Sequence, residues 1–333
     1  MKKVSKKDKL FFFENHFKTL DGLWMIETEN ETDWETALKI DLNVWIRLLK
    51  IIIRRIKRHL GITENNIENL IKILSYRWTI EGWKFEIAED GILKITSCPY
   101  NEAMKRNPNR HDRIKSICKD MCIPFYETIV NDFNSDIKIK REHFSGLNNE
   151  YCDFEFYYND EKFFPSKESI RLNVSKNDKL IYFEPNFFTM DGLWIIEVEN
   201  ETDWATALKV DIIVWQRLYK ILFRRVKRYL AIQGNTFKGL IEILSFCWSC
   251  EGYKYKIVKN ERREAILHIT ECPYYNIMQR NPERHDKIEA ICKEMCIPFY
   301  EPALKAFNPQ ISLKRKKFLG AGDKYCDFHF KVL

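Results

Sequence analysis

The sequence is poor in glycine and proline, with 11 and 10 of these residues in a chain of 333. Collagen-like repeats and low-complexity linkers need far more of both, so these classes are excluded. Apolar residues make up 45% of the chain and aromatic residues 14%. A chain with this composition can bury enough apolar surface to fold, and we therefore expect globular domains.

Long apolar runs are missing as well. No stretch of about 18 apolar residues occurs, and the lysine-rich start is followed only by the short apolar patch at residues 10–13. We therefore expect neither a membrane span nor a signal peptide, and we place the chain in the cytoplasm without a membrane partner. That compartment is reducing, so the ten cysteines are expected to bind metal, react or lie buried rather than form disulfides.

Four common enzyme signatures are absent: the Walker loop, G-x-G-x-x-G, H-E-x-x-H and G-x-S-x-G. The enzyme classes that these motifs mark are thereby excluded. The net charge of +7 is modest, and much of it lies at residues 54–58 and 224–228, where helices are expected to end. Cations at a helix C-terminus interact favourably with the helix dipole. We favour this interpretation over a nucleic-acid or anion surface, so nucleic acid is not the partner we expect.

What the sequence does contain is a tandem repeat. Residues 20–60 align without a gap on residues 190–230, and about two-thirds of the positions are identical. The offset between the copies is 170 in this stretch and 174 from the cysteines onward. The second copy therefore carries a four-residue insertion before Cys272, around residues 260–265, where a hairpin loop is expected. Each copy is long enough to bury its own core. We therefore predict two domains, residues 1–160 and 170–333, that form a pseudo-dimer within one chain.

Hydrophobic periodicity predicts the same order of elements in both copies: helices first, a hairpin, an inserted helix and a second hairpin. In the first copy, Thr19 or Asp21 is expected to cap a short helix, and Asp33 precedes a long amphipathic helix. This order predicts an α+β fold in each copy, with a small antiparallel sheet of about four strands. The remaining predicted elements are helices at residues 67–80, 101–106 and 111–133 and strands at residues 83–87, 93–97, 137–139 and 151–156.

Four cysteines recur in each copy at one constant offset, and they are the strongest chemical signal in the sequence. They are Cys98, Cys118, Cys122 and Cys152 in the first copy and Cys272, Cys292, Cys296 and Cys326 in the second. The second and third members are four residues apart on a predicted helix, so both thiols project from one face and can share an ion. The fourth alternates with two phenylalanines that should face the core, and the first lies at a strand end, where its direction is open.

Four thiolates from a strand end, a helix and a second strand fit a closed tetrahedral zinc site, and an iron–sulfur cluster is the alternative. Cysteine is also among the residues most often fully buried, so apolar burial and a reactive thiol remain open as further interpretations. Retention of all four cysteines in both copies favours one metal site per copy.

Histidines and glutamates near the thiols are secondary candidates. His111 and His285 precede the paired cysteines on the same helical stripe and could replace the first cysteine of each quartet, although a surface position is the simpler interpretation. Glu127 and Glu301 follow the thiols closely enough to act as a ligand or a general base, with a solvated carboxylate as the simpler interpretation.

Six acidic residues recur near expected helix starts, where capping is the simplest interpretation. Their first-copy members are Asp21, Glu27, Glu29, Glu31, Asp33 and Asp41. Recurring tryptophans at helical spacing are expected in the core. Cys247 and Cys250, which only the second copy has, are expected to be packing residues.

Short motifs in both copies carry a resemblance to known families. They are the Asp-Gly-Leu-Trp run at residues 21–24, residues 37–47 with their Asp41 and Trp45, the Cys98-Pro99 pair and the closing Cys152-x-Phe-x-Phe. Together they resemble an uncharacterised family of prokaryotic, often archaeal, cytosolic proteins over nearly all of each copy. Residues 322–328, with the pattern Gly-x-x-Tyr-Cys-Asp-Phe, are more distantly similar to the 4-vinyl-reductase domain and to the L-2-amino-thiazoline-4-carboxylic acid hydrolase family.

These resemblances imply an α+β domain with an enclosed small-molecule pocket. In the phenol-sensing relatives, a zinc ion is held by cysteine and glutamate near the final hairpin. Carried over, Cys152 and Cys326 match the last cysteine of that motif, and the paired cysteines of each quartet lie where its earlier ligands fall. The Glu-x-x-Cys that precedes the final cysteine in that family is absent here, so the ligand set differs. No hydrolase nucleophile can be carried over.

Three functions compete on these observations. The first, which we expect, is a metal-binding protein that binds or senses a small molecule and loses about two metal ions and its stability on chelation. The second is a cysteine-dependent hydrolase or an iron–sulfur redox enzyme, in which one thiol per copy is unusually reactive. The third is nucleic-acid binding, which requires an affinity that falls steeply with salt.

Overall fold

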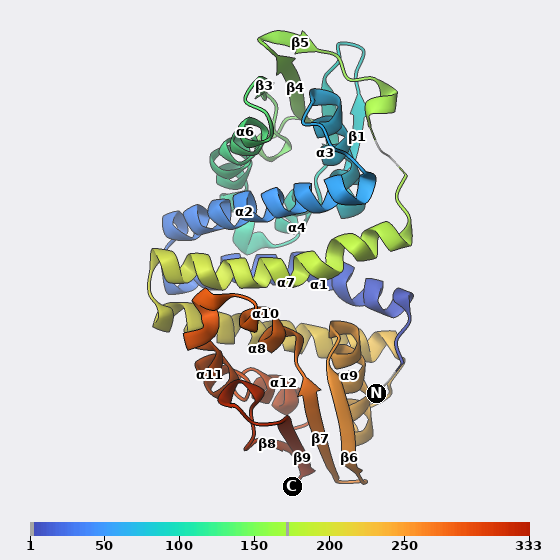
Figure 1. Cartoon of the computed structure of the whole chain (residues 1–333), viewed down its shortest axis with the longest axis vertical. Coiled ribbons are helices and arrows are strands. Elements are labelled where there is room, and N and C mark those ends of the chain that lie inside the picture. The colour runs from blue at the N-terminus through green and yellow to red at the C-terminus, as the bar shows by residue number, and fades with distance from the viewer. Residues whose placement is uncertain (1–2, 171–172) are drawn as a thin grey trace. The chain divides into compact units, whose positions relative to one another are not determined.

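The computed structural model describes residues 3–170 and 173–333 and shows one α+β arrangement twice (Figure 1). The fold class predicted from the sequence is confirmed. The first repeat contains α1 (Lys6–Glu31), α2 (Trp34–Leu60), α3 (Ile67–Glu81), β1 (Lys84–Ile87), β2 (Leu93–Ser97), α4 (Pro99–Lys105), α5 (Ile114–Ser116), α6 (Cys122–Phe133), β3 (Ile137–Lys140), β4 (Cys152–Tyr158) and β5 (Glu161–Phe163). The second repeat contains α7 (Lys176–Glu201), α8 (Trp204–Tyr229), α9 (Phe237–Glu251), β6 (Lys254–Asn260), β7 (Glu264–Glu271), α10 (Pro273–Gln279), α11 (Ile288–Ala290), α12 (Tyr300–Phe307), β8 (Ile311–Lys314) and β9 (Cys326–Val332). Within the described ranges, no helix combines the length and the apolar character needed to cross a membrane.

Both long amphipathic helices, α2 and α8, begin at an aspartate. Asp33 and Asp203 have extended backbone and each accepts a hydrogen bond of 2.9 Å, from the N–H of Thr36 and of Thr206. An acceptor at this position satisfies an N–H group that the first helical turn leaves free. The capping role expected for recurring aspartates therefore holds at these two positions.

The first helix is longer than the sequence pattern predicts. α1 begins at Lys6 because Ser5 and Asp8 cap each other, with Asp8 N–H donating to Ser5 Oγ at 3.2 Å and Ser5 N–H donating to Asp8 Oδ2 at 2.8 Å. Asp21 is buried inside this helix instead of starting it. The prediction of a short helix capped by Thr19 or Asp21 is therefore wrong, and the cap that was missed is the Ser-x-x-Asp pattern sixteen positions earlier.

The compact units of the structure differ from the sequence repeats. Unit 1 consists of the chain up to Glu31 together with Val198–Leu333, and unit 2 consists of Thr32–Glu197. The first helix of each repeat thus packs in the unit that the rest of the other repeat forms. The ranges 1–160 and 170–333 describe the duplication but not these units, because an apolar helix face does not show which copy it packs against.

Equivalent ion pairs fix each exchanged helix in its unit. In unit 1, Arg217 of α8 pairs with Glu27 of α1, and in unit 2, Arg47 of α2 pairs with Glu197 of α7. Both glutamates are buried. The capping role expected for these carboxylates is therefore wrong: they are buried partners of arginine, far from a helix start.

Each unit contains one antiparallel sheet, with strand order β1-β2-β4-β3 and β5 beside β4 in unit 2, and β6-β7-β9-β8 in unit 1. The insertion in the second copy lies in the β6–β7 hairpin, as expected. Ile95 lies opposite Cys152, and Ile269 lies opposite Cys326. The fourth cysteine of each quartet therefore starts an interior strand of its sheet.

Candidate functional site: the cysteine quartets

Four structural elements carry the four thiols of unit 2. Cys98 precedes α4, Cys118 lies in a π-helical turn (Ile117–Met121), Cys122 begins α6 and Cys152 begins β4. All are free thiols, as are their counterparts. The equivalent positions of unit 1 are Cys272, Cys292, Cys296 and Cys326.

The π-helical turn that holds Cys118 and ends at Cys122 is not apparent from the sequence. Cys122 N–H donates to the carbonyl of Ile117, five residues earlier, and the same kind of turn recurs in unit 1. Pro124 and Pro298 follow directly, and because proline has no N–H, the α-helical hydrogen bonds cannot run unbroken through this segment. Turns of this kind are rare and occur preferentially at functional sites.

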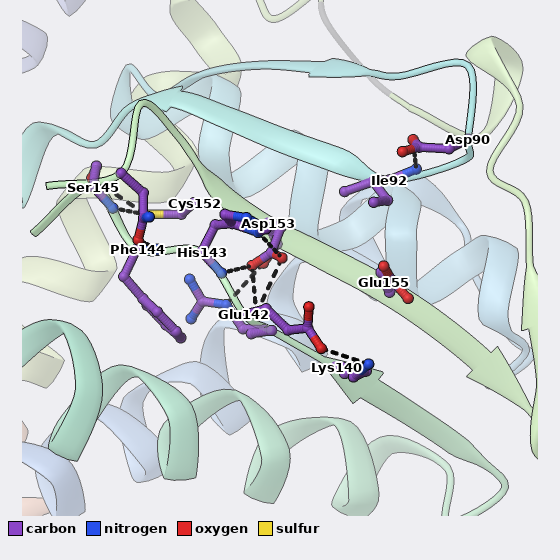
Figure 2. A network of polar contacts seen from close by, with 12 residues as sticks. Asp90, Ile92, Lys140, Glu142, His143, Phe144, Ser145, Cys152, Asp153 and Glu155 are labelled. Atoms are coloured by element: carbon purple, nitrogen blue, oxygen red, sulfur yellow. Dashed lines mark hydrogen bonds and ion pairs between the residues drawn. The ribbon is translucent and has the colours of Figure 1, made fainter. Parts of the chain in front are cut away.

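The loop between β3 and β4 lies against two of the sulfurs. Ser145 N–H donates to Cys152 Sγ at 3.2 Å, and Ser145 Oγ is 3.3 Å from the same sulfur (Figure 2). At the next residue, a Cβ added to Gly146 would lie 2.3 Å from Cys118 Sγ. Ser145 thus contacts Cys152 and Gly146 contacts Cys118. Because these two residues are consecutive, the two thiols lie close together. The loop of unit 1 repeats both contacts.

The first cysteine reaches the same neighbourhood through the start of α4. Burial raises the pKa of the Cys98 thiol, and the nearby backbone N–H groups of Asn101 and Tyr100 oppose this shift. Asn101 also links the helix to the loop, because its Nδ2 donates to Ser145 Oγ at 2.9 Å. The direction of Cys98, which strand alternation left open, is therefore decided by the start of a helix.

The thiols of each quartet act on one another electrostatically. The pKa of Cys118 is raised to about 12, mainly by burial and in addition by the neighbouring Cys122 and Cys152. The same two neighbours also contribute to the raised pKa of Cys98. In unit 1, burial followed by the neighbouring thiols raises the pKa of Cys292 to about 12. The thiols of each quartet therefore lie near enough to affect one another's pKa, and their assembly into a fourfold cluster stays a prediction.

These thiols do not reach the geometry of a formed metal site. Among residues 3–170 and 173–333, no three histidine, cysteine, aspartate or glutamate side chains converge as metal ligands. Zinc–sulfur bonds are about 2.3 Å long, so binding would require the sulfurs to close further around the ion. Metal binding at these residues therefore stays a prediction.

An arginine lies beside each quartet, half-buried in unit 2 and buried in unit 1, and neither was expected from the sequence. Arg141 Nη1 is 3.0 Å from Cys122 Sγ, and Arg141 Nε donates to the carbonyl of Asp153 at 3.0 Å. The guanidinium carbon lies 4.1 Å from the centre of the Phe154 ring. Arg315 takes the same position in unit 1. The signal that could have found both is their identical distance from the last cysteine in the two copies.

Asp153 fixes the loop that carries this arginine. Its buried carboxylate accepts hydrogen bonds from the N–H groups of Glu142 at 2.9 Å and His143 at 2.8 Å, and it lies 2.9 Å from His143 Nδ1 (Figure 2). Asp327 binds two backbone N–H groups in the same way in unit 1. Because these groups engage the carboxylate, Asp153 offers Arg141 only its carbonyl oxygen.

The secondary candidates take no part in these contacts. His111 and His285 are exposed, and their Nε2 atoms lie 2.8 and 3.0 Å from the carbonyl oxygen six residues earlier. The surface position favoured for these histidines is confirmed. Glu127 is exposed and Glu301 is half-buried. The two cysteines found only in the second copy are fully buried in α9, as expected for packing residues.

A buried charged cluster in unit 2 is a second feature that the sequence pattern does not predict. Arg77 and Glu81 of α3 are both 2% exposed, and Arg77 Nε lies 2.9 Å from Glu81 Oε1. Trp83 Nε1 donates to the same carboxylate at 3.0 Å, and Tyr182 of the exchanged helix α7 also donates to it. Arginine and tyrosine are lost together in unit 1, where the equivalent residues are Cys247, Glu251, Tyr253 and Phe12.

A surface cavity of about 540 Å³ lies at the start of α9 in unit 1. Its lining includes Lys238, Arg262 and Arg263 together with Phe237 and Val332, so it is basic with apolar walls and contains residues of the hairpin insertion. None of the quartet cysteines lines it. This cavity is therefore not the enclosed pocket that the family resemblance implies.

Two family models match the chain, one on each repeat. Residues 3–157 match a family of unknown function (DUF6125), and residues 187–330 match the L-2-amino-thiazoline-4-carboxylic acid hydrolase family. Each match covers less than half of the chain. No curated protein and no solved structure matches it. Because the repeats are copies of one domain, the chain is similar to both families through the same kind of domain, and the resemblance to the hydrolase family is supported for the second repeat.

Proposed function

We propose that each unit holds one metal centre at its cysteine quartet and that the chain is a metal-binding protein with two such centres. Zinc fits four cysteine thiolates most simply, and an iron–sulfur cluster is the alternative. The observation that carries the proposal is a pair of arginines, the half-buried Arg141 and the buried Arg315, each lying against the sulfurs of one quartet.

A buried guanidinium needs a negative partner, because removing an unpaired charge from water costs several kcal/mol. In the part of the chain that the structure describes, Arg141 forms no ion pair with a carboxylate, and its hydrogen bonds go to the Cys122 sulfur and a backbone carbonyl. Burial alone would lower the pKa of Arg141, whereas the sulfurs of Cys122 and Cys152 raise it above its usual value. Neutral thiols would leave this cation without a counter-charge. Four thiolates around a divalent ion carry a net charge of about −2, which the arginine partly offsets.

Hydrogen-bond donors around the sulfurs give independent support. The backbone N–H groups of Ser145 and Leu319 donate to Cys152 and Cys326, at 3.2 Å in each unit. Donors that point at thiolates are common around metal–thiolate centres, where they orient and tune the ligand. A centre at this place would join α4, the π-helical turn and the central strand of the sheet. A small-molecule ligand is the finer part of the proposal, and the resemblance to the hydrolase family supports it.

Elemental analysis of anaerobically purified protein tests the proposal. We expect about two zinc ions per chain, or iron with acid-labile sulfide, and a lower thermal midpoint after chelation. Cys118→Ser should remove one of the two ions, whereas Cys247→Ala, at a buried cysteine outside the quartets, should leave the metal content unchanged. A chain that contains no metal and keeps its full stability in chelator would refute the proposal.

The match of residues 187–330 favours a second candidate function, a hydrolase acting on L-2-amino-thiazoline-4-carboxylic acid or a related cyclic compound. Cys296 and Glu301 are the thiol and the carboxylate that the sequence places together in this repeat. Loss of the thiazoline ring can be followed by absorbance for the native protein, Cys296→Ser and Glu301→Gln, with Glu127→Gln as the matched first-repeat control. No turnover by either the metal-loaded or the metal-free protein would eliminate this candidate and leave the metal proposal intact.

A further inference from the structure

We propose that the two quartets are chemically unequal: the quartet of unit 1 exchanges its metal and reacts with thiol-directed electrophiles, whereas the quartet of unit 2 is a stable structural centre. This inference rests on the metal centres proposed above. The eight cysteines and the two arginines are the same in both copies, so the inequality must come from the residues around them. One difference lies at the sulfurs, and another lies in the helix that follows the third cysteine.

The difference at the sulfurs is a hydroxyl group. In unit 2, Ser145 Oγ accepts a hydrogen bond from Asn101 Nδ2 at 2.9 Å and lies 3.3 Å from Cys152 Sγ. Because the hydroxyl oxygen already accepts from the amide, its hydrogen is free to point at the sulfur, in addition to the N–H donation from the same residue. Cys152 is thus contacted by two groups of one loop residue (Figure 2), and Asn101 of α4 keeps that residue in place.

Unit 1 lacks this hydroxyl. Leu319 and Tyr275 take the positions of Ser145 and Asn101, so Cys326 keeps the backbone donation at 3.2 Å without the side-chain donor. A hydrogen bond donated to a thiolate withdraws charge from sulfur, which lowers its nucleophilicity and helps to hold it as a ligand. Cys326 is therefore the more nucleophilic ligand of the two.

The arginines of the two units contact the sulfurs with different donor atoms. Arg141 Nη1 donates to Cys122 Sγ at 3.0 Å, whereas Nη1 of Arg315 has no hydrogen-bond partner among the described residues. The guanidinium of Arg315 still interacts with Cys296 and Cys326. Over residues 3–170 and 173–333, Nη1 of Arg315 is unused, whereas the corresponding atom of Arg141 donates to the third cysteine of its quartet.

The helix after the third cysteine also differs. In unit 2, α6 begins at Cys122 itself, whereas in unit 1 Cys296 lies in a turn and α12 begins only at Tyr300. Pro302 takes the position of Thr128, and a proline has no N–H to donate to the carbonyl four residues earlier. The substitution therefore removes a helical hydrogen bond close to Cys296.

A compensating residue shows that this carbonyl needs a partner. Gln216 Nε2 of α8 donates to the carbonyl of Pro298 at 3.2 Å, and the first copy has Ile46 at the position of Gln216. Proline and glutamine thus occur together in unit 1, where a side chain replaces the lost helical donor. The segment keeps the helical bonds from Phe299 N–H to Met295 and from Glu301 N–H to Ile297, and only the bond to Pro298 is replaced by a side chain. A segment with one helical bond fewer opens locally at lower free energy, so Cys296 can leave a metal more readily than Cys122.

Solvent access predicts the opposite order of reactivity. Cys292 is buried, at 6% exposure, whereas its counterpart Cys118 is half-buried. If access of a reagent controlled the chemistry, unit 2 would react first. The order in which the quartets react therefore distinguishes control by hydrogen bonding and helix structure from control by exposure.

Alkylation of the zinc-loaded full chain with N-ethylmaleimide tests the proposal. The thiolate sulfur adds to the alkene carbon, the resulting enolate takes a proton from water, and the zinc loses one ligand, which a chromophoric chelator then reports. Mass spectrometry of peptides identifies the modified cysteines at each time. We expect two phases of zinc release, the faster by about tenfold and accompanied by labelling of Cys296 and Cys326.

Two variants exchange the local surroundings between units. Leu319→Ser combined with Tyr275→Asn should slow the fast phase, and Ser145→Ala should accelerate the slow one, each with two zinc ions still bound. If a variant fails to fold, the order in which the two quartets of the native chain are labelled still tests the proposal. Equal rates at both quartets, or labelling of unit 2 first, with two zinc ions bound, would overturn the inequality and leave the metal proposal standing. A chain without metal would refute both.

Discussion

At the scale of single residues, burial decides which ionisable groups control stability. His16 is fully buried in α1, and this burial, assisted by the positive charge of Arg225, lowers the pKa of its imidazole from 6.5 to about 3. The folded chain therefore holds the neutral ring well into the acid range. The second repeat has Asn186 at this position, a side chain of related polarity that does not titrate.

Replacing this histidine should change the acid side of the stability profile. Between pH 6.5 and about 3 the unfolded chain binds a proton at His16 that the folded chain excludes, so stability falls as the pH falls through this window, by up to about 1.4 kcal/mol per pH unit. His16→Asn should remove that dependence and leave stability at pH 8 nearly unchanged. Urea unfolding at pH 5, 6, 7 and 8 measures both. An identical pH slope in the native chain and the variant would show that His16 is not the titrating group.

The glycine beside the quartet is a second residue with a sharp expectation. A Cβ at residue 146 would lie 2.3 Å from Cys118 Sγ and 2.9 Å from Ile114 Cγ2. Gly146→Ala should therefore displace the loop and destabilise the protein by about 1–3 kcal/mol. Gly22→Ala is the matched control, because nothing lies within 4 Å of the added Cβ and alanine favours a helix. The close packing of this loop would be contradicted if neither Gly146→Ala nor Gly22→Ala lowered the thermal midpoint of unfolding.

At the scale of elements, the caps and breaks of helices place the thiols. Pro99 starts α4 directly after Cys98, and Pro124 follows the π-helical turn that carries Cys118 and ends at Cys122. The closing loop is tied by Asp153 to two backbone N–H groups. Each thiol is therefore positioned by an interruption of regular structure and not by the middle of a helix or strand.

The aspartate caps provide a prediction at the same scale. Asp33→Ala removes the acceptor for Thr36 N–H at the start of α2, and it should lower the free energy of unfolding by about 1 kcal/mol. Asp203→Ala should have a similar effect, because the same contact starts α8. Asp33→Asn, which keeps an acceptor oxygen, should cost much less. Denaturant unfolding of the three variants tests this, and equal losses for alanine and asparagine at residue 33 would argue against capping.

At the scale of the whole molecule, the exchange of the first helices determines which residues meet. Glu81 binds Arg77 of its own repeat and Tyr182 of the other. In unit 1 both partners change together, to Cys247 and Phe12. This joint change is expected if α7 packs with the first repeat, and it would have no explanation if each repeat kept its own first helix.

A double-mutant cycle tests the exchange. Arg77→Met and Tyr182→Phe share the buried carboxylate of Glu81, so their effects on stability should be non-additive by about 1 kcal/mol or more. Phe12→Leu belongs to unit 1, so its effect should add to that of Arg77→Met without coupling. Coupling of Arg77 to Phe12, and none to Tyr182, would show that the helices are not exchanged.

Much of each unit can be predicted from local pattern, because local pattern is what secondary structure depends on. The apolar stripe after Asp33, the hairpin insertion and the inward direction of Cys152 all follow from spacing along the chain. The start of α1 is also a local signal, the Ser5–Asp8 pair, and it was overlooked because the apolar patch after it has no clear helical periodicity. The nearness of the thiols within a quartet is predictable because duplication retains the four cysteines together.

By itself, the sequence determined the duplication, the α+β class and the identity of the eight thiols, since these depend on residue type and on spacing of up to a few residues. Tertiary structure alone decided that the first helix of each repeat packs with the other repeat, that an arginine faces each quartet and that the Ser145 hydroxyl lies against sulfur. These features join residues far apart along the chain. Their energies depend on which surfaces meet and on how little water remains between them, and no local pattern records either.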